Sequence, residues 1–262
     1  MRTKPVFAAI AGVVALTIIA LPVKAQPAAA ESGGEYAIPA GTPAHIRRAV
    51  ESTARTDEQR ARDVNRKPAE VLTLAGIEEG DRIIEFAAFG HYYTTMLVEA
   101  VGQDGRVDMY DLPYTERFAG EASRAFDAAH PNATYHQQDY NEVDFPSDVD
   151  AVLNVLYYHD LQPNDIDTAA LNEKLYGALR PGGTYLIIDH KAEDGSGWRD
   201  AGTIHRMGVE TIIEEVTAAG FELVENSDLL AHPEDDRTQM VFAPGTRGGT
   251  DRAVLLFRKP AR

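Results

Sequence analysis

The chain has 262 residues and a formal net charge of −16, from 41 acidic against 25 basic residues. An acidic surface repels nucleic-acid phosphates and anionic lipids, which argues against binding to nucleic acid and favours a small-molecule substrate as partner. The absence of cysteine excludes disulfides, thiolate zinc sites and thiol nucleophiles.

The first 25 residues have the pattern of a secretory signal peptide. Arg2 and Lys4 precede an apolar stretch over 6–23, and small residues lead up to Ala25, so that Gln26 would begin the mature chain. The stretch is also just long enough for an uncleaved membrane anchor, but a proline near its end and the alanine favour cleavage. We therefore predict an exported protein, periplasmic or secreted, without a stable membrane anchor after cleavage. Its oligomeric state stays open.

Residues 26–42 are rich in alanine, proline and glycine and predict a flexible leader before a single domain over 43–262. Thr56 and Gln59 have the spacing of a helix capping box. Pro68 fits the first turn of a further helix, which Gly76 is expected to end.

From residue 81 onward, short apolar runs alternate with helical patterns. Seven runs have the length and composition of strands: 82–87, 106–110, 133–136, 150–156, 184–188, 221–224 and 253–257. Helical patterns lie at 92–101, 115–129, 165–179 and 209–219, a Pro-Gly-Gly turn at 181–183, and long polar loops at 191–207 and 232–250. This alternation predicts an α/β fold with a doubly wound, mostly parallel seven-stranded sheet that helices cover on both sides.

Four landmarks in this pattern carry a resemblance to a known family. Glu85 lies at the end of the first strand, Asp111 ends the second, Asp139 follows the third, and the phrase LRPGG precedes the fifth at 179–183. From about residue 71 to residue 259, the chain resembles class I S-adenosylmethionine-dependent methyltransferases. The phrases YYHD at 157–160, IDH at 188–190 and IHR at 204–206, together with the ending over 251–260, resemble more narrowly an exported subgroup of predicted methyltransferases.

The resemblance implies a Rossmann-like fold and S-adenosylmethionine as cofactor, bound by Glu85, Ala87, Gly90, Asp111, Asp139 and Asn154. In an open parallel sheet, ligands bind beyond the carboxyl ends of the strands where the strand order reverses. Asp111 would there accept both ribose hydroxyls, or alternatively be a solvated carboxylate. Asp139 would accept a hydrogen bond from the adenine amino group, or alternatively cap a turn.

The first loop departs from the family pattern. Ala87, Phe89 and His91 stand where the family has glycines, and only Gly90 remains, one place away. Glycines permit positive φ and let the backbone approach the ligand closely. Histidine tolerates such a conformation better than phenylalanine does, and Phe89 is expected to project bulk toward the methionine end of the cofactor.

Three histidines, His159, His190 and His205, are expected at the same edge of the sheet. Alone, each would more commonly cap a strand end or bond a backbone carbonyl. With Asp160 and Asp189 adjacent to two of them, they predict a catalytic group in which His159 is the base and His190 or His205 orients the substrate. The same residues could instead bind zinc or another divalent metal, with Asp189 or Asp160 as ligand or supporting group. Their spacing is no metal signature, so we predict no metal site.

Methyl transfer from a sulfonium releases a neutral thioether and needs no acid, so positioning supplies most of the rate. The sequence therefore predicts an S-adenosylmethionine-dependent methyltransferase with a small-molecule acceptor. Two alternatives stay open: an exported binding protein that keeps the fold without the chemistry, and a metal-assisted hydrolase or lyase built on the histidines. A nicotinamide dehydrogenase is disfavoured, because no G-x-G-x-x-G follows the first strand.

Overall fold

The computed structural model describes residues 35–261. Within this range, no helix combines the length and the apolar character needed to cross a membrane. The signal peptide predicted for residues 1–25 lies outside the described residues, and so does most of the predicted leader. The described residues form a single domain.

A seven-stranded sheet in the order β3-β2-β1-β4-β5-β7-β6 forms the centre of this domain. Its strands are β1 (Arg82–Phe86), β2 (Arg106–Asp111), β3 (Ala133–Gln137), β4 (Val149–Val155), β5 (Leu179–His190), β6 (Glu222–Ser227) and β7 (Arg252–Arg258). Strands β1 to β5 run parallel, and β7 runs antiparallel between β5 and β6. The predicted α/β fold with a doubly wound, mostly parallel sheet is confirmed.

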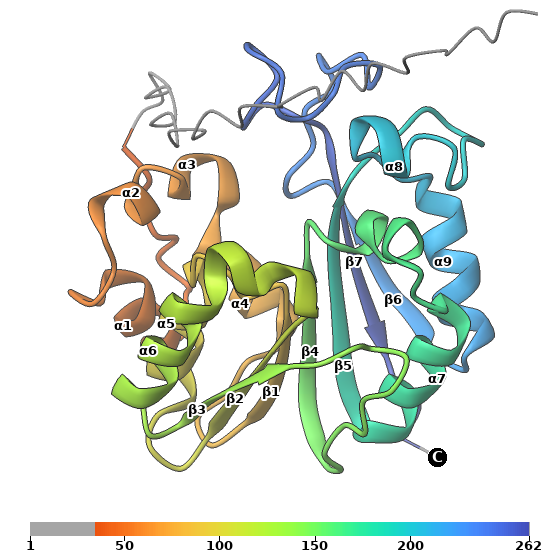
Figure 1. Ribbon diagram of the computed structural model, residues 1–262. Coiled ribbons are helices and arrows are strands. Elements are labelled where there is room, and N and C mark those ends of the chain that lie inside the picture. The colour runs from red at the N-terminus through yellow and green to blue at the C-terminus, as the bar shows by residue number, and fades with distance from the viewer. Residues whose placement is uncertain (1–34, 262) are drawn as a thin grey trace, which may run out of the picture. The chain divides into compact units, whose positions relative to one another are not determined.

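Helices cover both faces of the sheet, as Figure 1 shows. One face carries α1 (Ala44–Glu51), α4 (Pro68–Ala75) and α5 (Tyr92–Val101), with α6 (Glu121–Ala129) beside β3. The other face carries α7 (Thr168–Ala178) and α9 (Val209–Ala218). Three helices of a single turn complete the set: α2 (Asp57–Arg60), α3 (Asp63–Arg66) and α8 (Ala201–Ile204).

Strand alternation divides the apolar side chains between two cores. Ile83 of β1 and Met109 of β2 belong to the core that includes α4 and α5. Their neighbours Ile84 and Tyr110 belong to the core that includes α7 and α9. The central strands are thus buried on both sides, which explains why β4 carries apolar residues on both of its faces.

Local sequence signals set the boundaries of the early helices. The Thr56 hydroxyl accepts the backbone N–H of Gln59 at 3.2 Å, and the Gln59 side chain accepts the backbone N–H of Thr56 at 3.0 Å. This is the predicted capping box at the start of α2. Helix α4 begins at Pro68 and is followed by Gly76, whose φ of 72° ends it in the left-handed conformation.

Two predicted helices begin later than expected. The helix predicted for 115–129 is preceded by a 3-10 turn, η1 (Pro113–Thr115), and a π-helical turn, η2 (Glu116–Gly120), so that α6 begins only at residue 121. The helix predicted from residue 165 begins at Thr168, because the Asp167 side chain accepts the N–H of Ala170 and caps it there.

Strand β5 is longer than predicted at both ends. It begins at Leu179 and carries the Pro-Gly-Gly turn as an irregularity in its pairing with β4. At its other end it includes Asp189 and His190, which therefore lie at the carboxyl end of a paired strand. The predicted loop 191–207 contains α8, and the segment 232–250 has no helix or strand among its described residues.

Candidate active site

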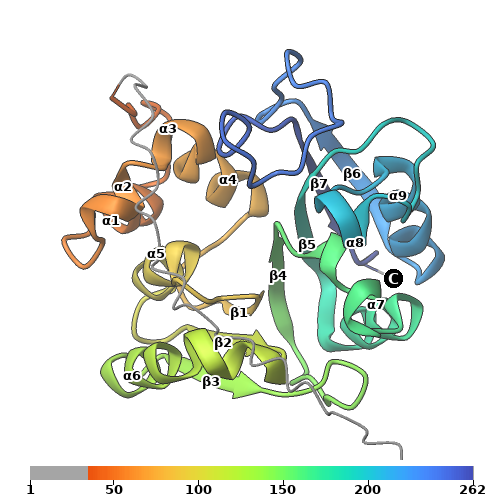
Figure 2. The same cartoon turned by 45° about the horizontal axis from the view of Figure 1, so that its top comes forward.

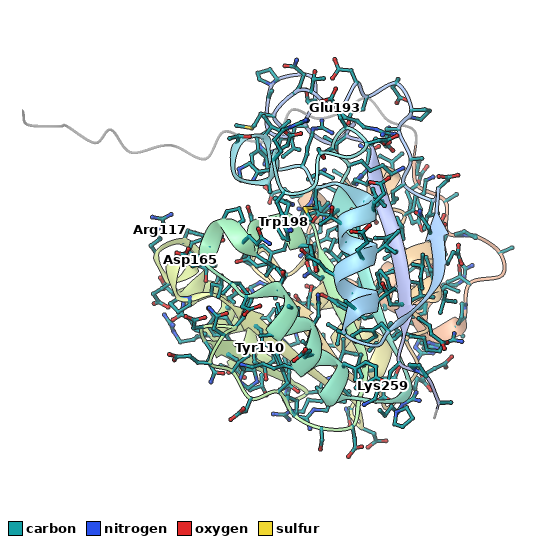
Figure 3. All side chains as sticks on the ribbon, turned by 90° about the vertical axis from the view of Figure 1, so that its right-hand side faces the viewer. Tyr110, Arg117, Asp165, Glu193, Trp198 and Lys259 are labelled. Atoms are coloured by element: carbon teal, nitrogen blue, oxygen red, sulfur yellow. The ribbon has the colours of Figure 1, made fainter. Side chains whose placement is uncertain are left out.

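The carboxyl ends of β1, β2, β4 and β5 meet at one edge of the sheet, which Figure 2 turns toward the reader. The strand order reverses between β1 and β4, and open parallel sheets bind ligands at such a point. Figure 3 places Glu193, from the segment after β5, at this end of the domain and Lys259, which follows β7, at the opposite end. The predicted site residues come from these strand ends and from the segments that follow them.

The loop between β1 and α5 has the backbone shape that glycines usually provide. Ala87, Gly90 and His91 have φ of 52°, 85° and 49°, in the left-handed region that costs a residue other than glycine about 1–2 kcal/mol. Phe89 is not among the described residues with positive φ. Two of the three positions where the family has glycine therefore keep the left-handed conformation without it, and the third does not need it.

Contacts from distant segments hold this loop. The Gln59 side-chain amide donates to the carbonyl oxygens of Gly90 and His91, at 3.3 and 3.1 Å. The His91 ring stacks on Phe126 with ring centroids 4.6 Å apart, and its Nε2 lies 3.2 Å from the Ser123 hydroxyl. Such contacts maintain a strained backbone conformation. The sequence predicted Gln59 only as a helix cap and missed this second role.

Two buried carboxyl groups lie on neighbouring strands at the base of this loop. Glu85 of β1 and Asp111 of β2 are 5% and 0% exposed. Within residues 35–261, Oε2 of Glu85 and both carboxyl oxygens of Asp111 have no hydrogen-bond partner. Burial raises the pKa of Glu85 to about 8 and that of Asp111 to about 6, where the nearby N–H of Ala88 offsets it only in part. Because buried polar atoms are seldom left unpartnered, these oxygens mark a place for a ligand that donates hydrogen bonds.

The structure does not bring Asn154 to this carboxyl pair. Asn154 pairs in register with Phe86, whose side chain belongs to the core under α7 and α9. Its buried amide therefore points to the opposite face of the sheet from Glu85.

Asp139 is half-buried, and its Oδ1 accepts the backbone N–H of Asn141 at 2.9 Å. This is the turn-capping role that the sequence left as an alternative.

The three predicted histidines lie together, with His159 between the other two and Asp189 holding it. Its carboxylate accepts the ring Nδ1–H of His159 at 2.6 Å and the backbone N–H groups of His159 and His190, each at 2.7 Å. The ring centroids of His190 and His205 lie 5.9 and 5.3 Å from that of His159. His159 comes from η3 (Tyr158–Asp160), the 3-10 turn after β4, and His205 directly follows α8. Three segments of the chain, η3, the end of β5 and the residue after α8, thus meet at one point of the edge.

His159 and His190 have different electrostatic environments. Burial opposes protonation of His159, but the charge of Asp189 and its hydrogen bond outweigh burial and raise the pKa of the ring. Burial lowers the pKa of His190 well below its usual value, and the nearby His159 and arginines lower it further. The Nδ1 of His190 lies 2.8 Å from the Thr250 hydroxyl. His190 is therefore a neutral ring with a partner of its own, which the sequence did not indicate.

His159 and His205 converge on Asp160. Oδ1 of Asp160 lies 3.5 Å from Nε2 of His159 and 3.1 Å from Nδ1 of His205. A carboxylate can only accept a hydrogen bond, so the bond to Asp189 places the proton of His159 on Nδ1. The lone pair of His159 is therefore on Nε2, on the side of Asp160. The result is an imidazole base whose orientation a buried carboxylate fixes.

Exposed aromatic rings lie beside both groups. Phe89 and Phe118 meet edge-on with ring centroids 5.6 Å apart, and Phe89 meets Tyr157 at 6.3 Å. Tyr157 directly precedes the turn that carries His159, so this row of rings lies between the β1–α5 loop and the histidines. Phe242, which is 54% exposed, lies 5.1 Å from the His205 ring. Exposed rings around polar groups favour a ligand with an apolar or aromatic part.

The buried Arg206 holds the segment 232–250 at this edge of the sheet through hydrogen bonds. Arg206 is fully buried and donates to the Asp235 carboxylate at 2.7 and 3.1 Å and to the Gln239 carbonyl at 2.8 Å. Arg237 in turn pairs with Asp251 at 2.9 Å. Bidentate arginine–carboxylate pairs fix both the distance between the two side chains and their relative orientation. The predicted loop is thus anchored beside His205.

Comparison with solved structures identifies the fold. An S-adenosylmethionine-dependent methyltransferase from Aquifex aeolicus is similar, with a TM-score of 0.53 and 16% identity over 72% of this chain and 88% of that one. An S-adenosylmethionine-dependent methyltransferase from Mesorhizobium loti has a TM-score of 0.53 and 15% identity over 73% of this chain and 97% of that one. The [4+2]-cyclase SpnF has a TM-score of 0.54 and 15% identity over 79% of this chain and 85% of that one. No protein-family model and no curated protein matches the sequence. The chain has the fold of class I S-adenosylmethionine-dependent methyltransferases, as the sequence landmarks indicated.

Proposed function

We propose that the protein is an S-adenosylmethionine-dependent methyltransferase that acts on a small molecule with an apolar or aromatic part. The observation that carries this proposal is the buried pair of Glu85 and Asp111, whose unpartnered oxygens lie at the base of a loop with left-handed backbone. The pair sits at the carboxyl ends of β1 and β2, next to the reversal of strand order where this fold binds ligands.

The donor and acceptor groups of the chain fit this cofactor. A ribose offers two hydroxyl donors, and Asp111 offers two oxygens without partners. When bound, the cofactor would supply an electrophilic methyl group on a sulfonium. Because Asp111 is fully buried, a ligand reaches it only if a neighbouring segment moves, and we propose that this segment is η1 with η2. Tyr114 of η1 is close enough to Asp111 to interact with it electrostatically. The π-helical turn η2 is of a type often found at functional sites.

His159 is the side chain placed to take a proton from an oxygen or nitrogen acceptor. Asp189 holds the Nδ1–H, which leaves Nε2 free to accept the proton and stabilises the positive charge that the ring then carries. His205 lies beside His159, and the exposed ring of Phe242 lies beside His205; both would position the acceptor. No acid is needed, because the departing thioether is neutral.

The comparisons favour neither the binding protein without chemistry nor the hydrolase or lyase. The neighbouring structures from Aquifex aeolicus and Mesorhizobium loti are methyltransferases. SpnF uses the same fold as a cyclase, so the fold supports methyl transfer without establishing it. The proposal therefore depends on cofactor binding.

Calorimetric titration with S-adenosylmethionine and with its demethylated product tests the proposal. We expect micromolar binding of both, and Asp111→Asn should weaken it about 10- to 100-fold, because a hydrogen bond to a charged group contributes about 1.5–3 kcal/mol. Asp104→Asn is the matched control, since Asp104 is exposed near the other end of β2. No binding up to millimolar concentration, or an equal loss in both variants, would contradict the proposal.

A further inference from the structure

Three side chains at the histidine end of the site have the geometry of metal ligands. One ligand atom each from His159, Asp160 and His205 lies within 4.8 Å of the other two. The two directly measured separations, 3.5 Å from His159 Nε2 and 3.1 Å from His205 Nδ1 to Asp160 Oδ1, are close to what a single ion requires. Ligands at about 2.0–2.2 Å from a tetrahedral ion are about 3.3–3.6 Å apart. We propose that these residues bind a divalent transition-metal ion such as Zn²⁺.

The surroundings of His159 prepare its Nε2 for an ion. The Nδ1–H of a metal-binding histidine is commonly held by a carboxylate, which fixes the ring and directs the lone pair of the other nitrogen. Asp189 does this at 2.6 Å and is itself held by the backbone N–H groups of His159 and His190. The sequence placed Asp189 next to the histidines without indicating which ring it orients.

His205 is fixed in an unusual backbone conformation. Its φ of 58° is left-handed, which is uncommon for a residue with a side chain. The carbonyl of Ile204 accepts the N–H of Val241 at 3.3 Å, and the N–H of Met207 donates to the carbonyl of His190 at 2.9 Å. These bonds on both sides hold the His205 ring over Asp160, where the strained conformation serves the position of the side chain.

One side of the group stays open to a further ligand. The side chains of Asp160 and His205 are 22% and 32% exposed, whereas His159 is buried. Sites with three protein ligands and an open position are typical of ions that act on a bound molecule, and closed sites of four ligands are typical of structural ions.

The ligand set selects the class of ion. Two imidazole nitrogens and one carboxylate oxygen suit Zn²⁺, Co²⁺ or Ni²⁺, whereas Mg²⁺ and Ca²⁺ prefer oxygen ligands alone. Binding would displace the proton from His205 Nδ1, which now faces the Asp160 carboxylate. The formal charge of −16 attracts cations to the protein as a whole.

Ion binding at this place goes beyond the proposed function and does not depend on a bound cofactor. If the proposed function holds, the ion would replace His159 as the group that activates an oxygen acceptor, because an acceptor hydroxyl bound to the ion loses its proton to solvent more readily.

Calorimetric titration of the untagged protein with Zn²⁺, without cofactor, tests the inference. We expect one ion per chain, no competition from Mg²⁺, and visible absorption bands when Co²⁺ is used instead. His205→Ala and Asp160→Asn should each weaken binding at least about tenfold, and Asp189→Asn about 10- to 100-fold through the orientation of His159. Because His205 is partly exposed, its variant keeps the test valid even if the buried Asp189 variant fails to fold.

His136→Ala is the matched control. Nε2 of His136 pairs with Asp108 at 2.9 Å, the same kind of contact on β3 and β2 and outside the proposed ligand group. This variant should bind Zn²⁺ as the unaltered protein does. The inference fails if the unaltered protein binds no Zn²⁺ at up to millimolar concentration, if His205→Ala and Asp160→Asn bind normally, or if His136→Ala loses as much affinity as they do. Since no cofactor is present, none of these results depends on methyl transfer.

Discussion

The negative charge of Glu85 opposes folding, because the side chain is buried. Burial raises its pKa to about 8, whereas an unfolded glutamate has a pKa of about 4.3. Between these values, the unfolded chain releases the proton and the folded chain keeps it. The folded state is therefore penalised progressively as the pH rises through this window, and the cost is complete above pH of about 8. A buried acid of this kind makes sense where a ligand supplies hydrogen-bond donors.

Replacing Glu85 by glutamine removes this cost while keeping the shape of the side chain. We compare the free energy of unfolding of Glu85→Gln with that of the unaltered protein. The difference in favour of the variant should be about 1–4 kcal/mol larger at pH 8.5 than at pH 5. Urea unfolding at the two pH values measures this difference. Glu99→Gln, which changes an exposed acid on α5, should show no such dependence on pH. An effect of Glu85→Gln that is equal at both pH values would contradict the raised pKa.

Among the elements, the loop between β1 and α5 lacks glycines at positions where its backbone is left-handed. Ala87 has a φ of 52°, and Ala88, next to it, is buried without positive φ. Ala87→Gly should stabilise the protein by about 0.5–1 kcal/mol, because relief of strain exceeds the added freedom of the unfolded chain. Ala88→Gly should destabilise it by about 1 kcal/mol, because nothing is relieved there. Denaturant unfolding separates the two. Equal destabilisation by both would show that Ala87 is not strained.

Sequence patterns predicted the elements well where the signal lies within a few neighbouring residues. The apolar residues over 150–156 correctly predicted strand β4, and Gly76 correctly predicted the end of α4. The helix predicted over 115–129 was wrong at its start, where residues 116–120 form a π-helical turn, because a pattern of 3.6 residues per turn does not indicate such a turn. The direction of Asn154 was hidden for a related reason. In a strand that is apolar on both faces, alternation shows which residues share a face but not which layer of helices that face meets.

At the histidines, the sequence predicted proximity but not the contacts. The parallel fold brings the ends of β4 and β5 together, so His159 and His190 were expected at one edge. Which aspartate orients His159 depends on side-chain directions, and Asp189 does so although Asp160 is its neighbour in the chain. The contact of Gln59 with the loop between β1 and α5 has no local sequence pattern, because the partners are far apart in the sequence.

Within residues 35–261, the candidate functional groups lie at one edge of the sheet, at the carboxyl ends of its parallel strands. The left-handed loop, the carboxyl pair, the row of aromatic rings and the histidine group all lie there, on the fold of class I methyltransferases. The acidic charge of −16 argues against a nucleic-acid substrate and agrees with a small-molecule acceptor. Export through residues 1–25 stays a prediction from the sequence.

A crystal structure of the protein with the demethylated cofactor product tests most directly whether the altered loop still forms a cofactor site. We predict that the ribose hydroxyls lie within hydrogen-bond distance of both Asp111 oxygens, that the segment around Tyr114 has moved, and that Ala87 and His91 keep positive φ. Product bound elsewhere, or an Asp111 carboxyl group still enclosed and unpartnered in crystals grown at millimolar product, would contradict the account.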